Sequence, residues 1–147
     1  MIMNDKELLL QDMSARLPYG VKVKVNSEYL SEGLIKAGYD KPLVVYSMTA
    51  DGSISFTLDK GLMEYSMPIL GIKPYLFPLS SMTEEQKVEF EEMSELDVEY
   101  TITQIENNST IWTSGLNRFN WFLKNHFDVY GLIPMELAID ATGLSIY

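Results

Sequence analysis

The stretch "PLVVYSMTADGSISFTLD" (residues 42–59) decides most of the expected fold. Two runs rich in β-branched and aromatic residues flank the dipeptide Asp51-Gly52, which suits the positive φ angles of a tight hairpin turn. The apolar positions of the second run alternate with polar ones and share one face of a strand: Ile54, Phe56 and Leu58. The stretch therefore predicts a β-hairpin with one face turned toward a core.

Two further elements are expected before the hairpin. "VKVKV" (residues 21–25) alternates strictly between apolar and basic residues, which predicts a strand with one solvated face. "NDKELLLQDMSARLPYG" (residues 4–20) predicts a helix, because Asn4 is a favourable N-cap and Glu7 stands in the capping-box position. The segment 27–40 fits either a short helix or an irregular crossover, since its two glycines weaken a helix.

After the hairpin, "KPYLFPLSSMTEEQ" (residues 73–86) predicts an extended apolar brace that packs on the core. Pro74 and Pro78 argue against a central strand, because proline cannot donate to a sheet ladder. Thr83 and Gln86 form a second capping box, so a helix is expected from about residue 84 to 94.

The apolar residues of this expected helix are few, namely Val88, Phe90 and Met93. A helix with so little to bury lies on the surface with a broad acidic face.

The last third predicts a strand at 98–105, a helix at about 115–125 and a short helix at about 134–138. All elements together indicate a single α+β domain spanning residues 1–147. Its sheet is expected to be mostly antiparallel, with about four strands and with helices packed on one face.

Composition excludes several functions. The net charge is −10, and residues 82–99 alone carry eight acidic and one basic side chain, a sum of −7. No basic stripe is visible, so direct binding to nucleic acid is not expected. The absence of cysteine excludes thiolate sites and suits a reducing cytosol. No apolar run is long enough for a membrane span and no secretory signal is visible, so a cytoplasmic protein is expected. Its glycines form no phosphate-binding loop, and no cofactor is expected.

The acidic segment is the candidate interaction surface, and its glutamates are Glu84, Glu85, Glu89, Glu91, Glu92 and Glu95. They fit a docking surface for a basic groove on another protein. The ordinary alternative is a solvated helix face that keeps the chain soluble. A calcium site is not expected, because the alternating Asp/Asn pattern with a central glycine is missing.

The single histidine, His126, stands two residues before Asp128. A His–Asp pair is compatible with acid–base catalysis, but no nucleophile motif accompanies it. The ordinary interpretation is structural: His126 closes the C-terminus of the preceding helix as a favoured cation, and together with Asp128 and Tyr130 it forms a corner of the chain.

Two stretches resemble a family of small proteins from gut Bacteroidetes and from their phages and mobile elements. These are "KPYLFPLSSMTEEQ" (residues 73–86) and "NWFLKNHFDVYGLIPMELAIDA" (residues 120–141). The corresponding family motifs read "PYLRPLSSMTEEE" and "WLNKNHFDYRGLIPMGLALEA". The chain departs from them with Phe77 in place of an arginine and Val129-Tyr130 in place of Tyr-Arg. The resemblance brings no known activity and implies a cytoplasmic accessory protein of phage or mobile-element origin.

Three functions follow as hypotheses. We favour a non-enzymatic accessory protein that binds another protein, since no motif indicates a chemistry. The second is a structural or assembly component of a phage, for which a homo-oligomer is expected. The third is a small hydrolase-type enzyme that uses His126 and Asp128.

Overall fold

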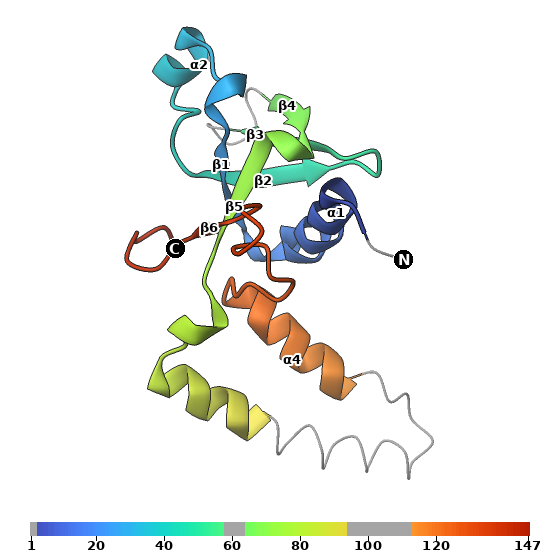
Figure 1. Cartoon of the computed structure of the whole chain (residues 1–147), viewed down its shortest axis with the longest axis vertical. Coiled ribbons are helices and arrows are strands. Elements are labelled where there is room, and N and C mark those ends of the chain that lie inside the picture. Colours follow the sequence, from blue (N-terminus) through green and yellow to red (C-terminus); the bar gives the residue numbers. More distant parts are fainter. Residues whose placement is uncertain (1–2, 58–63, 94–112) are drawn as a thin grey trace.

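The computed structural model describes residues 3–57, 64–93 and 113–147, and these form the expected α+β fold (Figure 1). A six-stranded mixed sheet has the order β4-β3-β2-β1-β5-β6. All neighbouring strands are antiparallel except β5 and β6, which are parallel. The expectation of about four antiparallel strands was therefore close but missed the parallel edge. The strands are β1 (Lys22–Val25), β2 (Leu43–Met48), β3 (Ser53–Thr57), β4 (Glu64–Pro68), β5 (Ile72–Leu76) and β6 (Ile139–Asp140).

The helices are α1 (Asp5–Arg16), α2 (Glu32–Ala37), a helix at 84–93 and α4 (Thr113–Lys124). The capping box predicted for α1 is confirmed, because Asn4 and Glu7 each accept a hydrogen bond from the other's backbone N–H. The ambiguous segment 27–40 contains α2, which ends at Gly38 with φ of 99°. The strand expected at 98–105 lies outside the described residues.

The predicted hairpin is confirmed as β2 and β3, but its turn is wider than expected. Four residues, 49–52, connect the strands, and the N–H of Thr49 donates to the carbonyl of Ser53 (2.9 Å). Only Gly52 has a positive φ, at 89°. A Cβ at this glycine would stand 2.6 Å from Cε of Lys6, which a flexible lysine can relieve by moving, so it is the positive φ that favours glycine here.

Pro74 lies inside β5, between β1 and β6, so the expectation that proline excludes a central strand was wrong. The N–H of Asn26 donates to Gly71 (2.8 Å), and hydrogen-bonded pairs alternate along an antiparallel ladder. Val23 and Pro74 are consequently a non-hydrogen-bonded pair, in which the backbone nitrogen of each residue points away from the other strand. Because β6 pairs only with Tyr75 and Leu76, the missing N–H of Pro74 interrupts no ladder.

The rest of the stretch 73–86 follows the prediction in part. Leu76 is fully buried, Phe77 is half-buried and Leu79 is exposed. The predicted capping box at Thr83 and Gln86 is present, with both reciprocal hydrogen bonds. The stretch is thus a strand, a short 3₁₀ turn and a capped helix.

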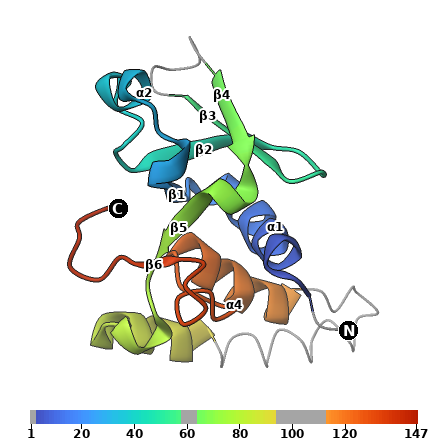
Figure 2. The same ribbon diagram turned by 45° about the horizontal axis from the view of Figure 1, so that its top comes forward.

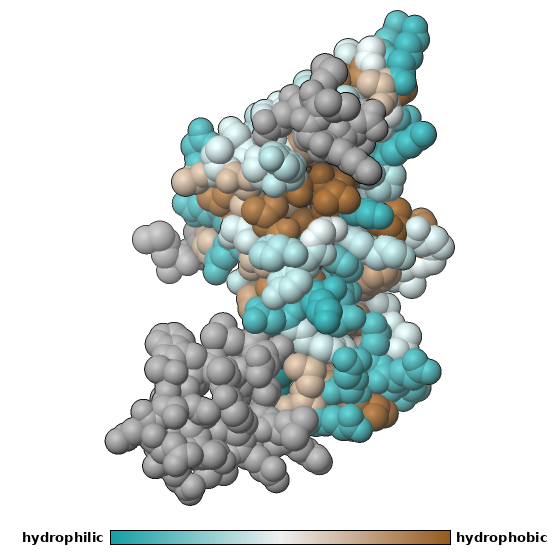
Figure 3. Space-filling model, turned by 180° about the vertical axis from the view of Figure 1, so that it is seen from behind, coloured by the Kyte–Doolittle hydropathy of each residue, from teal (hydrophilic) through white to brown (hydrophobic). Residues whose placement is uncertain are grey.

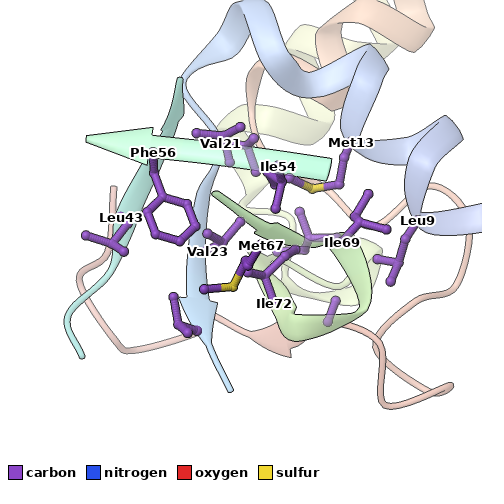
Figure 4. Close-up of a cluster of buried hydrophobic side chains, with 14 of the residues drawn as sticks. Leu9, Met13, Val21, Val23, Leu43, Ile54, Phe56, Met67, Ile69 and Ile72 are labelled. Atoms are coloured by element: carbon purple, nitrogen blue, oxygen red, sulfur yellow. The ribbon is translucent and has the colours of Figure 1, made fainter. Parts of the chain in front are cut away.

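The core lies between α1 and one face of the sheet, and Figure 4 shows Met13 and Leu9 of α1 pointing toward Ile54 and Ile69. Full burial of each such side chain contributes about 1.5–3 kcal/mol. The labelled core residues are Leu9, Met13, Val21, Val23, Leu43, Ile54, Phe56, Met67, Ile69 and Ile72.

The short helix expected at 134–138 is absent, and hydrogen-bonded turns take its place. The N–H of Leu137 donates to Leu132 and that of Glu136 to Ile133, and Glu136 adopts a φ of 61°. A left-handed residue ends a helix before it forms a second turn. Met135, within the segment that we expected to be helical, is exposed.

Candidate functional site

The helix at 84–93 presents the candidate acidic surface, and five of its six predicted glutamates are described: Glu84, Glu85, Glu89, Glu91 and Glu92. All five are exposed, and Glu95 lies outside the described residues. Val88, which we expected to be buried, is 54% exposed. Residues three and four positions away in a helix are surface neighbours, so a ring of four glutamates surrounds Val88: Glu84, Glu85, Glu91 and Glu92.

The opposite side of this helix is anchored to α4. The ring of Phe90 lies 5.0 Å from that of Phe122 and 5.7 Å from that of Trp121, measured between centroids. Glu89 turns toward α4, and its carboxylate accepts a hydrogen bond from Nε1 of Trp121 (3.0 Å). Figures 1 and 2 both show the helix lying against α4 at one end of the molecule.

Little of the negative charge on this helix is balanced by neighbouring basic side chains. Lys87 pairs with Glu84 at 3.0 Å, but both side chains are largely exposed, and such pairs are worth little in water. In the view from behind, this end of the molecule is mostly hydrophilic with a small apolar area (Figure 3). The face therefore carries an excess of negative charge around an aliphatic centre.

His126 ends α4, although not as the cation we expected. Its φ is 63°, the N–H of His126 donates to Leu123, and the N–H of Phe127 donates to Phe122. This is the Schellman arrangement, with histidine at the position that glycine usually takes. Burial lowers the pKa of His126 to about 4, helped by the nearby charges of Arg16 and Lys22. The imidazole is thus neutral at pH 7, and the expected cation–helix interaction does not apply.

Tyr147 stacks on His126 and joins two strands. Its hydroxyl accepts a hydrogen bond from the N–H of Lys22 (3.0 Å) and donates one to the carbonyl of Tyr75 (2.8 Å). Along the β1–β5 ladder, Lys22 and Tyr75 occupy the next hydrogen-bonded position after Lys24 and Lys73. The hydroxyl therefore fills a gap where the two strands separate. Burial raises the pKa of Tyr147 to about 12, so the hydroxyl remains protonated as this geometry requires.

Asp128 is buried and serves the chain reversal that follows it. Its carboxylate accepts hydrogen bonds from the N–H groups of Leu132 (2.8 Å) and Ile133 (3.0 Å). Tyr130, the third residue assigned to the corner, is half-buried and packs edge-on against Phe119. Among the described contacts, the carboxylate of Asp128 is held by these two backbone N–H groups, and no hydrogen bond joins it to His126.

The sequence analysis missed a buried ion pair in α1. Nε of Arg16 lies 2.6 Å from Oδ1 of Asp12, with both side chains fully buried. Nη2 of Arg16 also donates to the carbonyl of Phe127 (2.6 Å), which ties α1 to the end of α4. Burial raises the pKa of Asp12, and the hydrogen bond and charge of Arg16 oppose that shift. The signal was available, since Asp12 and Arg16 share the helix face of Leu9 and Met13 at spacings of three and four.

A cavity of about 530 Å³ lies where α1 meets the end of the β3–β4 pair. Its charged groups are Lys6 and Asp51, and Asp51 is engaged by the hydroxyl of Thr49 and the N–H of Ser53. These hydrogen bonds lower the pKa of Asp51, which keeps it an anion that braces the turn. The charged side chains that line the cavity are thus one lysine and one carboxylate that is already hydrogen-bonded, which do not resemble a catalytic acid and base. Its lining is Lys6, Asp51, Gly52, Ser53, Ser66, Met67, Pro68, Ile69 and Leu70.

Groups of metal-binding side chains and membrane-spanning helices are both absent from the part of the chain that the structure describes. Across residues 3–57, 64–93 and 113–147, no three His, Asp or Glu side chains are grouped to hold a metal ion. In the same part of the chain, no helix has both the length and the apolar character needed to cross a bilayer.

Comparison of the chain with protein-family models, with curated proteins and with solved structures gives no match.

Proposed function

We propose that this chain is a non-enzymatic accessory protein that binds another protein through the outer face of the helix at 84–93. The observation that carries the proposal is the setting of Val88, which is exposed at the centre of a ring of four glutamates. An aliphatic side chain gains free energy when a partner covers it, and the surrounding carboxylates favour a basic partner.

The helix meets its partner in a preformed state. Its N-terminus is fixed by the capping box of Thr83 and Gln86, and its inner side is fixed by the contact between Phe90 and α4. A surface that is ordered before binding loses less conformational entropy in the complex. This rigidity supports a docking role over a purely solvating one.

The test is a pull-down from host-cell lysate with the full chain as bait, at about 50 mM and about 500 mM salt. High salt screens exposed charge pairs and should therefore weaken binding to the acidic face. The informative variant is Glu91→Lys/Glu92→Lys, which reverses half of the ring. Glu84 and Glu85 are left intact because acidic residues in the first turn stabilise the helix itself. A matched control, Glu28→Lys/Asp40→Lys, makes the same charge change at exposed positions elsewhere.

We expect a basic protein to be recovered at low salt by the wild-type chain and by the control, but not by the ring variant. Mass spectrometry identifies the recovered protein, and circular dichroism verifies that both variants fold. Equal recovery by the ring variant, or recovery that does not change with salt, would show that the acidic face is not the docking surface.

The biological setting is part of the same proposal. The two motifs that resemble proteins of gut Bacteroidetes and their phages or mobile elements support such an origin, and the cysteine-free composition is consistent with the cytoplasm. A phage assembly component is the second candidate, and it would require a stable oligomer. The hydrolase hypothesis has less support than these two, because the carboxylate of Asp128 already accepts hydrogen bonds from the N–H groups of Leu132 and Ile133.

A further inference from the structure

Three lysines lie together on the outer face of the sheet, away from the core. Lys24 of β1 is directly opposite Lys73 of β5, and Lys22 follows on the same face of β1. Like charges directly opposite each other destabilise a sheet. No residue of β1, β2 or β5 is acidic, and within the described parts of the chain the ion pairs are those of Asp12 with Arg16 and Glu84 with Lys87. Nζ of Lys22 donates to the carbonyl of Ile146 (2.8 Å) and lies 5.8 Å from the ring centroid of Tyr147, but neither neighbour is an anion. No described carboxylate pairs with any of the three lysines, so their positive charge is not neutralised by an ion pair.

Exposed apolar side chains adjoin these lysines. Val44 of β2 is directly opposite Lys22 and is 46% exposed, and Tyr46 on the same face of β2 is 62% exposed. We call these five residues the lysine face: Lys22, Lys24, Val44, Tyr46 and Lys73. A partner that covers it must supply anions around an apolar centre.

The chain itself carries the complementary surface. Around Val88 the four glutamates of the helix at 84–93 surround an aliphatic residue, as the lysines border Val44 on the sheet. Single-stranded nucleic acid also offers anions and stacking bases, and the net charge of −10 opposes the approach of a polynucleotide and of a second copy alike. The acidic helix is favoured because it combines its carboxylates with an aliphatic centre that matches Val44 beside the lysines.

We propose that the lysine face binds the helix at 84–93 of a second copy of this chain. The inference rests on the proposed function of that helix and adds a second copy of the chain to the partners that its outer face binds. Within one copy the two surfaces do not meet, since the helix packs on α4 at the end of the molecule remote from β2 and β3 (Figures 1 and 2). Each copy offers one donor and one acceptor surface, so the contact is either reciprocal in a dimer or propagates head to tail.

The experiment is sedimentation velocity of the full chain over a range of concentrations, at about 50 mM and about 500 mM salt. We expect association at low salt, and an apparent dissociation constant that rises about tenfold or more at high salt. Lys24→Glu/Lys73→Glu and Glu91→Lys/Glu92→Lys should each be monomeric. Their equimolar mixture should associate again, because the reversed face of one variant matches the reversed helix of the other. The control Lys36→Glu/Lys124→Glu has the same charge change at exposed positions outside the face and should behave as the wild type.

Each outcome decides the proposal. A wild-type chain that stays monomeric at all concentrations, or a mixture of variants that stays monomeric, overturns self-docking. If the ring variant still loses a basic partner in the pull-down while the wild type is monomeric, the proposed function survives and only this inference fails. Binding of a fluorescent single-stranded oligonucleotide that is lost in Lys24→Glu/Lys73→Glu would assign the lysine face to nucleic acid and would also overturn it.

Discussion

The imidazole of His126 lies flat on the phenol ring of Tyr147, with the ring centroids 3.5 Å apart and an angle of 9° between the planes. His126 belongs to the end of α4, whereas the hydroxyl of Tyr147 lies between β1 and β5. One side chain therefore couples the last turn of a helix to the point where two strands separate. The same phenol ring also packs against Phe77, 6.0 Å away between centroids.

Removal of the hydroxyl in Tyr147→Phe should lower the free energy of unfolding by about 1–3 kcal/mol, because the N–H of Lys22 and the carbonyl of Tyr75 both lose their partner. The ring and its stacking on His126 remain. Urea unfolding of the purified protein measures the change. Tyr46→Phe is the matched control, since this exposed hydroxyl should change the free energy by less than about 0.5 kcal/mol. Equal effects of the two substitutions would contradict the bridging role.

The stability of the protein should fall as the pH is lowered from 6.5 toward 4 on account of His126. Its pKa is about 4 in the folded chain, against 6.5 for the free side chain, so the unfolded chain binds the proton first. The contribution of the neutral imidazole is complete above pH 6.5 and is lost by about pH 4.

The variant His126→Asn isolates this effect, because asparagine tolerates the left-handed backbone but does not titrate. The difference in unfolding free energy between wild type and variant should shrink as the pH falls through this range. Asp12, whose pKa is raised, contributes with the opposite sign to both proteins and cancels in the difference. A difference that stays constant with pH would refute the assignment.

Replacing Arg16 alone should be severe. Arg16→Met leaves the carboxylate of Asp12 buried without its cation, which costs about 3–5 kcal/mol. The double variant Asp12→Leu/Arg16→Met removes both charges and should regain most of that loss. Chemical denaturation of the single and double variants provides the comparison. If the double variant is as unstable as the single one, the hydrogen bond to Phe127, and not the buried charge, is the main contribution.

Two leucines of the stretch 73–86 should differ in how much stability their replacement costs. Leu76→Ala removes a fully buried side chain of β5 and should cost about 2–5 kcal/mol. Leu79→Ala changes a side chain that is 46% exposed, three residues later, and should cost less than about 0.5 kcal/mol. Thermal unfolding followed by circular dichroism distinguishes the two. A large loss for Leu79→Ala would mean that a partner or another part of the chain covers it.

The elements that the sequence predicted correctly depend on local chemistry. Asn4 with Glu7 and Thr83 with Gln86 satisfy the first N–H groups of their helices from within four residues, so no knowledge of the fold is needed. The hairpin was equally visible because alternation and the turn glycine lie close together. The width of its turn was not, since the Asp-Gly pair predicts a two-residue turn and the strands are joined by residues 49–52.

The errors arose where distant segments decide the outcome. Pro74 fits a central strand because β6 pairs with β5 only beyond it, and no local rule indicates where a partner strand begins. Val88 is exposed because α4 contacts the side of the helix that carries Phe90, whereas the sequence alone assigned every apolar residue to the interior. The sequence therefore predicted the acidic residues of the candidate site, but it did not predict that Val88 lies exposed among them.

The hydrogen bonds that join α1 and β1 to the last segment connect residues far apart in the chain. Arg16 and Phe127 are separated by 111 positions, Lys22 and Ile146 by 124, and Lys22 and Tyr147 by 125. A ribosome synthesises the first partner of each pair long before the second, and closing such long loops is slow. Until residues 126–147 emerge from the ribosome, Arg16 therefore lacks the carbonyl of Phe127 as its acceptor. During the same period, β1 lacks the phenol of Tyr147 that bridges it to β5.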